Sequence, residues 1–177
     1  MATDLYPYAR VAVDFDPTDT WDPTIAYGAA GYDHREKDWI GALFPYVDEA
    51  TGDRRILRGV RNTSSDPIPA NRLVFTDLGK TNIDHVEKGT GTTTPVTRTR
   101  GMTIAAIPAG HCGFVVCQGP VIGEAVGSDV TADTAITQDN NGLVKVGTIG
   151  THAIIGSSFE IIDVSVAVTG KIYIDVL

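Results

Sequence analysis

The sequence predicts an all-β protein: a small antiparallel β-barrel or sandwich preceded by an extended N-terminal arm. Val, Ile and Thr together supply 55 of the 177 residues, whereas Leu supplies only 7. β-Branched side chains fit a pleated strand and lose rotamer freedom in a helix. Nineteen Gly and nine Pro provide turns between short strands, and no helix-length window repeats its apolar residues at the helical period. We expect at most one short helix.

Residues 1–45 predict the arm, and residues 46–177 predict the barrel or sandwich. Both tryptophans and most of the tyrosines lie in the arm, scattered among Asp and Pro without a strand or helix period. Disordered tails carry few aromatics, so these side chains are expected to dock on a partner or on the protein's own barrel. A barrel of about 130 residues has the size of a self-sufficient domain, so the arm is not expected to be needed for folding.

The predicted barrel begins with a hairpin, in which a polar loop joins a strand over Phe44–Val47 to a strand over Arg54–Val60. In the second strand, Ile56 and Val60 share a face with two arginines. This mixed face predicts a strand at an edge or an interface.

Two further strands are predicted over Arg72–Phe75 and Met102–Ile107, with a flexible loop of Gly and Thr over residues 88–95 between them. The Gly-x-Gly of this loop lacks the third Gly and the following helix of a nucleotide cradle. Phosphate binding is therefore not expected there.

The last third predicts the clearest series of strands. The turn Asp139-Asn-Asn-Gly142 predicts a hairpin, and a three-residue turn at Val168–Gly170 predicts a C-terminal hairpin with Val164 opposite Ile174. The strands are expected over Gly113–Val116, Ala135–Gln138, Leu143–Val146, Ile154–Gly156, Phe159–Val168 and Lys171–Val176.

The charge balance argues against nucleic acid and membrane partners. Fourteen basic and 22 acidic residues give a net charge of −8, which repels phosphate backbones and anionic headgroups. The basic groups concentrate in residues 50–101, which carry nine against five acidic groups. The N-terminus shows no apolar run of signal-peptide or membrane-span length, so we expect synthesis in a cytoplasm.

His111, Cys112 and Cys117 are the strongest candidates for a metal site or a nucleophile. In one extended strand, the sulfurs of Cys112 and Cys117 lie ~16 Å apart on opposite faces, too far for one metal or one disulfide. Buried packing roles are expected instead. The histidines at positions 34, 85, 111 and 152 are isolated in sequence, and no catalytic motif organises them.

An acidic stretch in the arm superficially suggests calcium, through Asp14, Asp16, Asp19 and Asp22. A calcium loop requires Gly at its sixth position and Glu at its twelfth, where this chain has Asp19 and Ile25. The stretch is expected to face solvent or a partner. The sequence thus predicts no catalytic residue, no cofactor and no metal site.

Residues 58–64 (RGVRNTS), 68–75 (IPANRLVF), 101–120 (GMTIAAIPAGHCGFVVCQGP) and 154–160 (IIGSSFE) carry a resemblance. Their order of strands and turns resembles the head decoration (cement) and minor capsid structural proteins of tailed bacteriophages. The resemblance covers roughly residues 56–177 and excludes the arm. It rests on patterns of turns and strands, not on a catalytic signature.

The resemblance implies a non-enzymatic virion protein on the capsid exterior, made in the cytoplasm of a bacterial host. The implied partners are the major capsid protein and neighbouring decoration subunits, with a homotrimer as one option. Two alternatives stay open: a tail or head-fibre component for host attachment, and a small β-barrel binding module or hydrolase that uses His111 and Cys112.

The predicted interface combines aromatics of the arm with the basic hairpin. Trp21 and Trp39 are expected to anchor the arm on a partner, because burying an aromatic ring contributes ~1.5–3 kcal/mol. The full set is Tyr6, Tyr8, Trp21, Trp39, Arg54, Arg55, Arg58 and Arg61.

Overall fold

The computed structural model describes residues 16–24, 39–89, 98–139, 141–165 and 168–177. This part of the chain is all-β, as the composition predicts, and contains ten strands and no helix. The strands are β1 (Leu43–Val47), β2 (Arg54–Asn62), β3 (Leu73–Thr76), β4 (His85–Lys88), β5 (Thr99–Thr103), β6 (Cys112–Glu124), β7 (Ala135–Gln138), β8 (Val144–Val146), β9 (Gly156–Ser158) and β10 (Thr169–Asp175).

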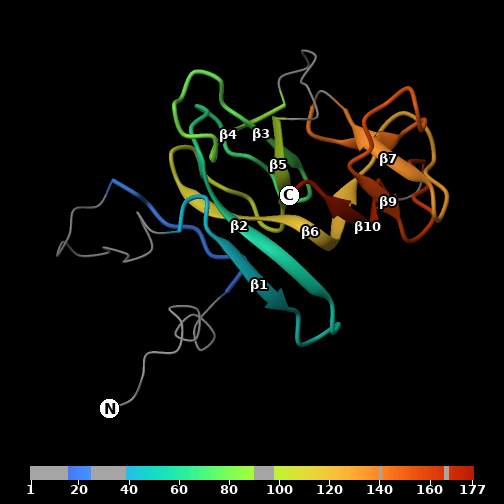
Figure 1. Cartoon of the computed structure of the whole chain (residues 1–177), viewed down its shortest axis with the longest axis horizontal. Helices are drawn as coiled ribbons and strands as arrows, with labels where there is room; N and C mark the ends of the chain where they lie inside the picture. The colour runs from blue at the N-terminus through green and yellow to red at the C-terminus, as the bar shows by residue number, and fades with distance from the viewer. Residues whose placement is uncertain (1–15, 25–38, 90–97, 140, 166–167) are drawn as a thin grey trace.

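The strands form one sheet in the order β1-β2-β4-β3-β5-β6-β10-β9-β7-β8, and β2 also pairs with β6 (Figure 1). The pairings therefore run from β2 through β4, β3, β5 and β6 back to β2. Two of these joints, β2 to β4 and β5 to β6, are only two residue pairs long, so the barrel is incompletely closed. β1 extends the sheet beyond β2, and β10, β9, β7 and β8 extend it beyond β6.

β6 is the long strand that joins the two halves. Its first half pairs with β2, and its second half pairs with β10 from Gln118↔Asp175 to Glu124↔Thr169. The backbone hydrogen bond from Val176 to Cys117 fixes the alternation of this ladder, so the nitrogen of Pro120 faces away from β10. The proline therefore removes no ladder bond, and the strand continues through it.

Two apolar cores lie on opposite faces of β6. The smaller core fills the barrel, where Val115 packs with residues from β2, β3 and β4; its members are Val60, Ile68, Val74, Val86, Ile107 and Val115. The larger core includes Val116 and reaches from the described arm residues to β10. The two successive valines thus face different cores, as the two-residue period of a strand requires.

Two predicted hairpins are confirmed. β1 and β2 pair from Leu43↔Arg58 to Val47↔Arg54 around the polar loop. β7 and β8 pair around the Asn-Gly turn, where Gly142 has a φ of +79° and donates a backbone hydrogen bond to Asp139. Positive φ is the conformation that glycine adopts without steric cost.

The prediction that the second strand of the first hairpin lies at an edge is wrong. β2 pairs with β1, β4 and β6 and is one of the most connected strands of the sheet. Its four arginines do not mark an edge, and two of them, Arg55 and Arg58, form ion pairs with carboxylates. The edge strand of this half is β1.

The predicted C-terminal hairpin is also wrong. β10 pairs with β6 and with β9, so Ile174 lies opposite Gly119 and Gly156 and not opposite Val164. Residues 159–165 form no strand, and Ile162 bridges to Val130. The seven-residue pairing with β6 buries Ile172 and Ile174 completely, which a two-stranded hairpin on the surface does not achieve.

Candidate docking surface

The described arm residues attach to the start of β6. Trp21 and Cys112 exchange two backbone hydrogen bonds, from the Trp21 N–H to the Cys112 carbonyl (3.1 Å) and from the Cys112 N–H to the Trp21 carbonyl (2.8 Å). Ile40 bridges in parallel to Gly59, where a side chain would collide with the Trp39 carbonyl. The glycine at position 59 therefore permits the close approach of the two segments.

Four aromatic rings pack together at this attachment. Phe114 of β6 lies 5.2 Å from Trp21, 5.7 Å from Trp39 and 5.7 Å from Phe44 between ring centroids. Trp21 is only 3% exposed, and Trp39 is half-buried. We call Trp21, Trp39, Phe44 and Phe114 the aromatic clasp.

The clasp changes the expected role of the arm. The structure does not place Trp21 where a partner could reach it, because its ring already packs in the protein's own core. Of the two docking options for the arm, the described residues follow the second, docking on the protein's own sheet. Tyr6 and Tyr8 lie outside the described residues.

The acidic stretch forms turns. Asp16 accepts hydrogen bonds from the N–H and hydroxyl of Thr18, and Asp22 does the same with Thr24, which lowers the pKa of both carboxyls. Such contacts satisfy the carboxylates within two residues. No group of three or more metal-ligating side chains occurs in the described part of the chain, and Asp14 lies outside it.

Arg55 belongs to an ion network at the end of the first hairpin. Its guanidinium lies 3.2 Å from Asp48 and 3.4 Å from Asp53. Asp53 also accepts a hydrogen bond from Lys171 of β10 at 2.9 Å, which is the main cause of its lowered pKa. The network ties the β1–β2 loop to the distant strand β10.

Arg58 forms an ion pair with Asp84, and Arg100 lies close to this pair. Its guanidinium lies 3.7 Å from Asp84, and the nearby Arg100 donates to the Thr76 hydroxyl (2.6 Å) and the Ile83 carbonyl (3.2 Å). Burial first, and then the charge of Arg58, lowers the pKa of Arg100. Asp84 thus forms an ion pair with Arg58 and acts on Arg100 only through its charge.

Arg61 lies beside His85 at the other end of β2, where it pairs with that residue in the sheet. Burial, followed by the charges of Arg61 and Lys80, lowers the pKa of His85. The imidazole is therefore held in its neutral form, and the pair forms part of the packed β2–β4 joint.

The expectation for the two cysteines is confirmed. Cys112 and Cys117 are free thiols, and both are completely buried. The Cys117 thiol donates to the Ile56 carbonyl at 3.2 Å, and burial raises its pKa. A buried neutral thiol is a packing group and a poor nucleophile.

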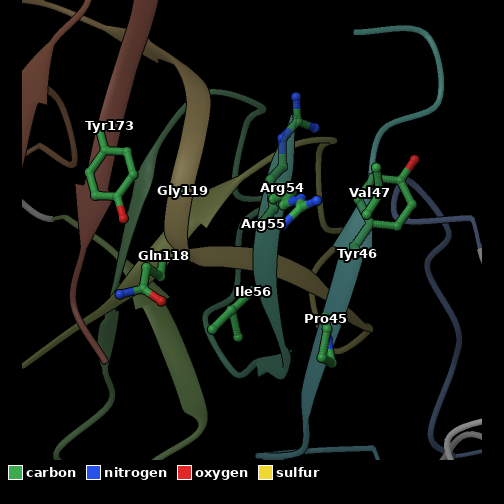
Figure 2. Close-up of a pocket in the computed structure, with 9 residues that line it drawn as sticks. All are labelled: Pro45, Tyr46, Val47, Arg54, Arg55, Ile56, Gln118, Gly119 and Tyr173. Carbon is green, nitrogen blue, oxygen red and sulfur yellow. The ribbon is translucent and has the colours of Figure 1, made fainter. Parts of the chain in front are cut away.

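A groove of about 360 Å³ lies where β2 and β6 separate (Figure 2). Figure 2 shows Tyr173 of β10 on one side and Pro45 and Val47 of β1 on the other. Gly119 forms part of the floor at a φ of +115°, and a side chain there would lie 2.6 Å from the Arg54 carbonyl. The remaining lining residues are Tyr46, Arg54, Arg55, Ile56 and Gln118.

Cross-strand pairing places much of the lining on one face of the sheet. Pro45 lies opposite Ile56, which lies opposite Gln118, and Val47 lies opposite Arg54. Directly opposed residues share a face. Val47 is 53% exposed, so this face presents apolar side chains to solvent.

The same face continues along β10. Ile122 of β6 lies opposite Lys171, and Phe159 donates its N–H to the Lys171 carbonyl and stacks edge-on against Tyr173 at 6.2 Å. Ile122 is 44% exposed and Phe159 is 51% exposed. Clusters of exposed apolar side chains are typical of interaction surfaces.

Arg54 is the one predicted interface arginine that is exposed and lacks an ion pair within the described ranges. Sequence reasoning found this residue but missed Gln118 and Tyr173, because it assigned β10 to a different partner strand. Gln118, Pro120 and Ile122 occupy alternate positions and therefore share one face of an extended strand. This pattern was the sequence signal that could have indicated the surface.

The described residues contain no helix long and apolar enough to cross a membrane. No family model and no curated protein matches the chain. Among solved structures, the chain is similar to the N base of the head fibre protein gp8.5 of bacteriophage phi29. The TM-score is 0.46 with 15% identity, over 67% of this chain and 94% of that one. Similarity at this level carries no argument about function.

Proposed function

We propose that this chain is a non-enzymatic structural protein of a bacteriophage virion that decorates the capsid exterior and stabilises it by docking on major capsid subunits. The observation that carries the proposal is the surface on β1, β2, β6 and β10, where exposed apolar side chains share a face with Arg54, which has no ion pair among the described residues. The strand and turn patterns of residues 56–177 support the same role through their resemblance to decoration proteins.

The contacts made by the cysteine and histidine side chains support a structural role. Cys112 and Cys117 pack in the interior, and His111 and His152 contact the backbone of their own loops. The clasp holds the described part of the arm on the sheet and leaves the groove face open. A decoration protein requires this combination of a rigid body and an open contact face.

The test uses virions of the phage that encodes this chain. Mass spectrometry of separated heads and tails, followed by cryo-electron microscopy of whole particles, is expected to find the chain on the outer head surface. Heads assembled without the chain are expected to bind the purified protein in a co-sedimentation assay, whereas isolated tails do not. Recovery of the chain only with tails would favour host attachment, and its absence from both fractions would overturn the proposal.

A further inference from the structure

We propose that the groove between β1 and β10 is a peptide-docking site that receives an extended, carboxylate-bearing segment of a partner polypeptide. The inference deepens the proposed function and rests on it only in taking that partner to be a capsid subunit. The groove itself is defined by Pro45, Val47, Arg54, Ile56, Gln118 and Tyr173, which we call the groove residues.

Charge places the carboxylate of the occupant on the β2 side of the groove. On that side, Asp53 is already engaged by Lys171 and Arg55, and Asp48 is engaged by Arg55. The exposed carboxylate of Asp175 lies on the β10 side, opposite Gln118. Arg54 is exposed and has no carboxylate partner in the described part of the chain. The exposed cation of the groove wall is therefore complementary to a carboxylate, and a charge-assisted hydrogen bond to it is stronger than a neutral one.

The polar and apolar lining fits an extended peptide. The Gln118 amide both donates and accepts, and the Tyr173 hydroxyl does the same, so the two groups match the N–H and C=O of a peptide backbone. Val47, Ile56 and Pro45 supply apolar contact for an aliphatic or proline side chain. A volume of about 360 Å³ accommodates a few side chains.

Recognition by side chains is favoured over strand addition. The Pro120 nitrogen faces away from β10, on the side of β6 that borders the groove. A strand added along this side would lack a donor at its centre. The groove therefore selects its occupant through the groove residues.

The first experiment measures peptide binding by NMR on the full-length ¹⁵N-labelled chain. The probes are the capped peptide Ac-Ala-Glu-Pro-Leu-Ala-NH₂ and its Glu-to-Gln analogue. We expect the Glu peptide to shift resonances of the groove residues and the Gln analogue to bind about tenfold more weakly. Equal binding of the two peptides, or shifts that map elsewhere, would overturn the assignment of a carboxylate.

Variants test whether peptide affinity depends on the guanidinium of Arg54 or on the positive charge of the chain in general. Arg54→Gln is expected to weaken the Glu peptide about tenfold, Arg54→Lys to restore part of the affinity, and Lys145→Gln on the distant β8 to leave it unchanged. An equal loss in Arg54→Gln and Lys145→Gln would show non-specific attraction and refute the site. Both positions are on the surface of strands, so the fold is retained and a ¹⁵N spectrum verifies it.

Head binding distinguishes this inference from the proposed function. If heads bind the wild-type chain and Arg54→Gln equally, the decorating role stands and the groove is not the docking site. If the Glu peptide binds in the groove but the chain is absent from virions, the peptide site stands and the decorating role falls. A loss of head binding in Arg54→Gln that is not seen in Lys145→Gln supports both the decorating role and the groove as the docking site.

Discussion

Trp21 and Cys112 form an antiparallel bridge in which each backbone N–H donates to the carbonyl of the other residue. The bridge adds the described part of the arm to the free side of β6, next to the position where β5 begins its pairing. The indole then lies 5.2 Å from Phe114 and closes the larger core. The segment around Trp21 is therefore part of the folded body.

The first prediction follows from this burial. Trp21→Ala is expected to lower the free energy of unfolding by ~3–5 kcal/mol, the range for a large aromatic removed from a packed core. Urea unfolding monitored by circular dichroism measures the change. Val47→Ala, at a 53% exposed position, is the matched control and is expected to change stability by less than about 0.5 kcal/mol. A similar small loss for Trp21→Ala would show that the clasp is not part of the cooperative unit.

The second prediction concerns the ion pair between Arg58 and Asp84. Asp84→Asn leaves Arg58 and Arg100 without a counter-charge, and we expect a loss of about 2 kcal/mol, below the ~3–5 kcal/mol of a fully buried broken pair. Arg58→Met is expected to cost less in the Asp84→Asn background than in the wild type. A double-mutant cycle measured by chemical denaturation reports this coupling, and strictly additive effects would exclude it.

The fold class and the local turns could be predicted from the sequence because they depend on near neighbours. β-Branched composition fixes the strand content, and Asn141-Gly142 fixes the β7–β8 hairpin through the positive φ at Gly142. β4 was missed because only Val86 among its four residues is apolar and buried, so no alternation marks it.

The pairing of β10 and the groove depend on long-range competition, which local patterns do not report. β10 could pair with residues 159–168 or with β6, and burial of Ile172 and Ile174 in the larger core favours β6. The length of β6 could not be predicted because a proline normally interrupts a central strand, whereas the nitrogen of Pro120 faces away from β10 and removes no bond of that ladder. The sequence singles out Arg54 through the basic hairpin, and its role at an interface stays a prediction, whereas its neighbours across the groove could not be predicted.

The third prediction tests the pairing of β9 with β10. A side chain at Gly156 would lie 1.8 Å from the Tyr173 carbonyl, so Gly156→Ala forces the two strands apart. We expect a loss of about 1–3 kcal/mol from this overpacking. Gly79→Ala is the control, because it lies in an exposed turn where the nearest atom to an added side chain is an Asp77 carboxylate oxygen at 3.1 Å. Equal thermal stability of the two variants would contradict the β9–β10 register.

The fourth prediction concerns acid stability. The hydrogen bond from Lys171 lowers the pKa of Asp53 in the folded state. A lowered carboxyl pKa contributes stability that is present above the unfolded value of ~3.9 and is lost as the pH falls through the folded value. Lys171→Met is therefore expected to destabilise the protein at about pH 6 and to reduce the further loss between about pH 5 and about pH 2. Parallel pH profiles for the two proteins would show that the pair does not contribute.

The last prediction concerns Pro45 in the edge strand β1. The backbone hydrogen bonds from Asp48 to Asp53 and from Gly59 to Ala42 set the alternation of the β1–β2 ladder, so residues 43, 45 and 47 direct their backbone nitrogens away from β2. At the centre of this outer edge, the proline presents no N–H to a neighbouring strand. Natural sheets use proline in this way to prevent edge-to-edge association.

Pro45→Thr restores the donor and adds a residue that favours strands, so we expect concentration-dependent self-association that the wild-type chain does not show. Analytical ultracentrifugation over a series of protein concentrations measures it, with Pro69→Thr outside the strands as the control. The monomer fold is expected to persist, because Pro45 donates no bond to β2 in the native ladder. If Pro45→Thr sediments as the wild type does at every concentration, Pro45 is not the feature that prevents association of this edge, although the exposed Leu43 and Val47 flank it.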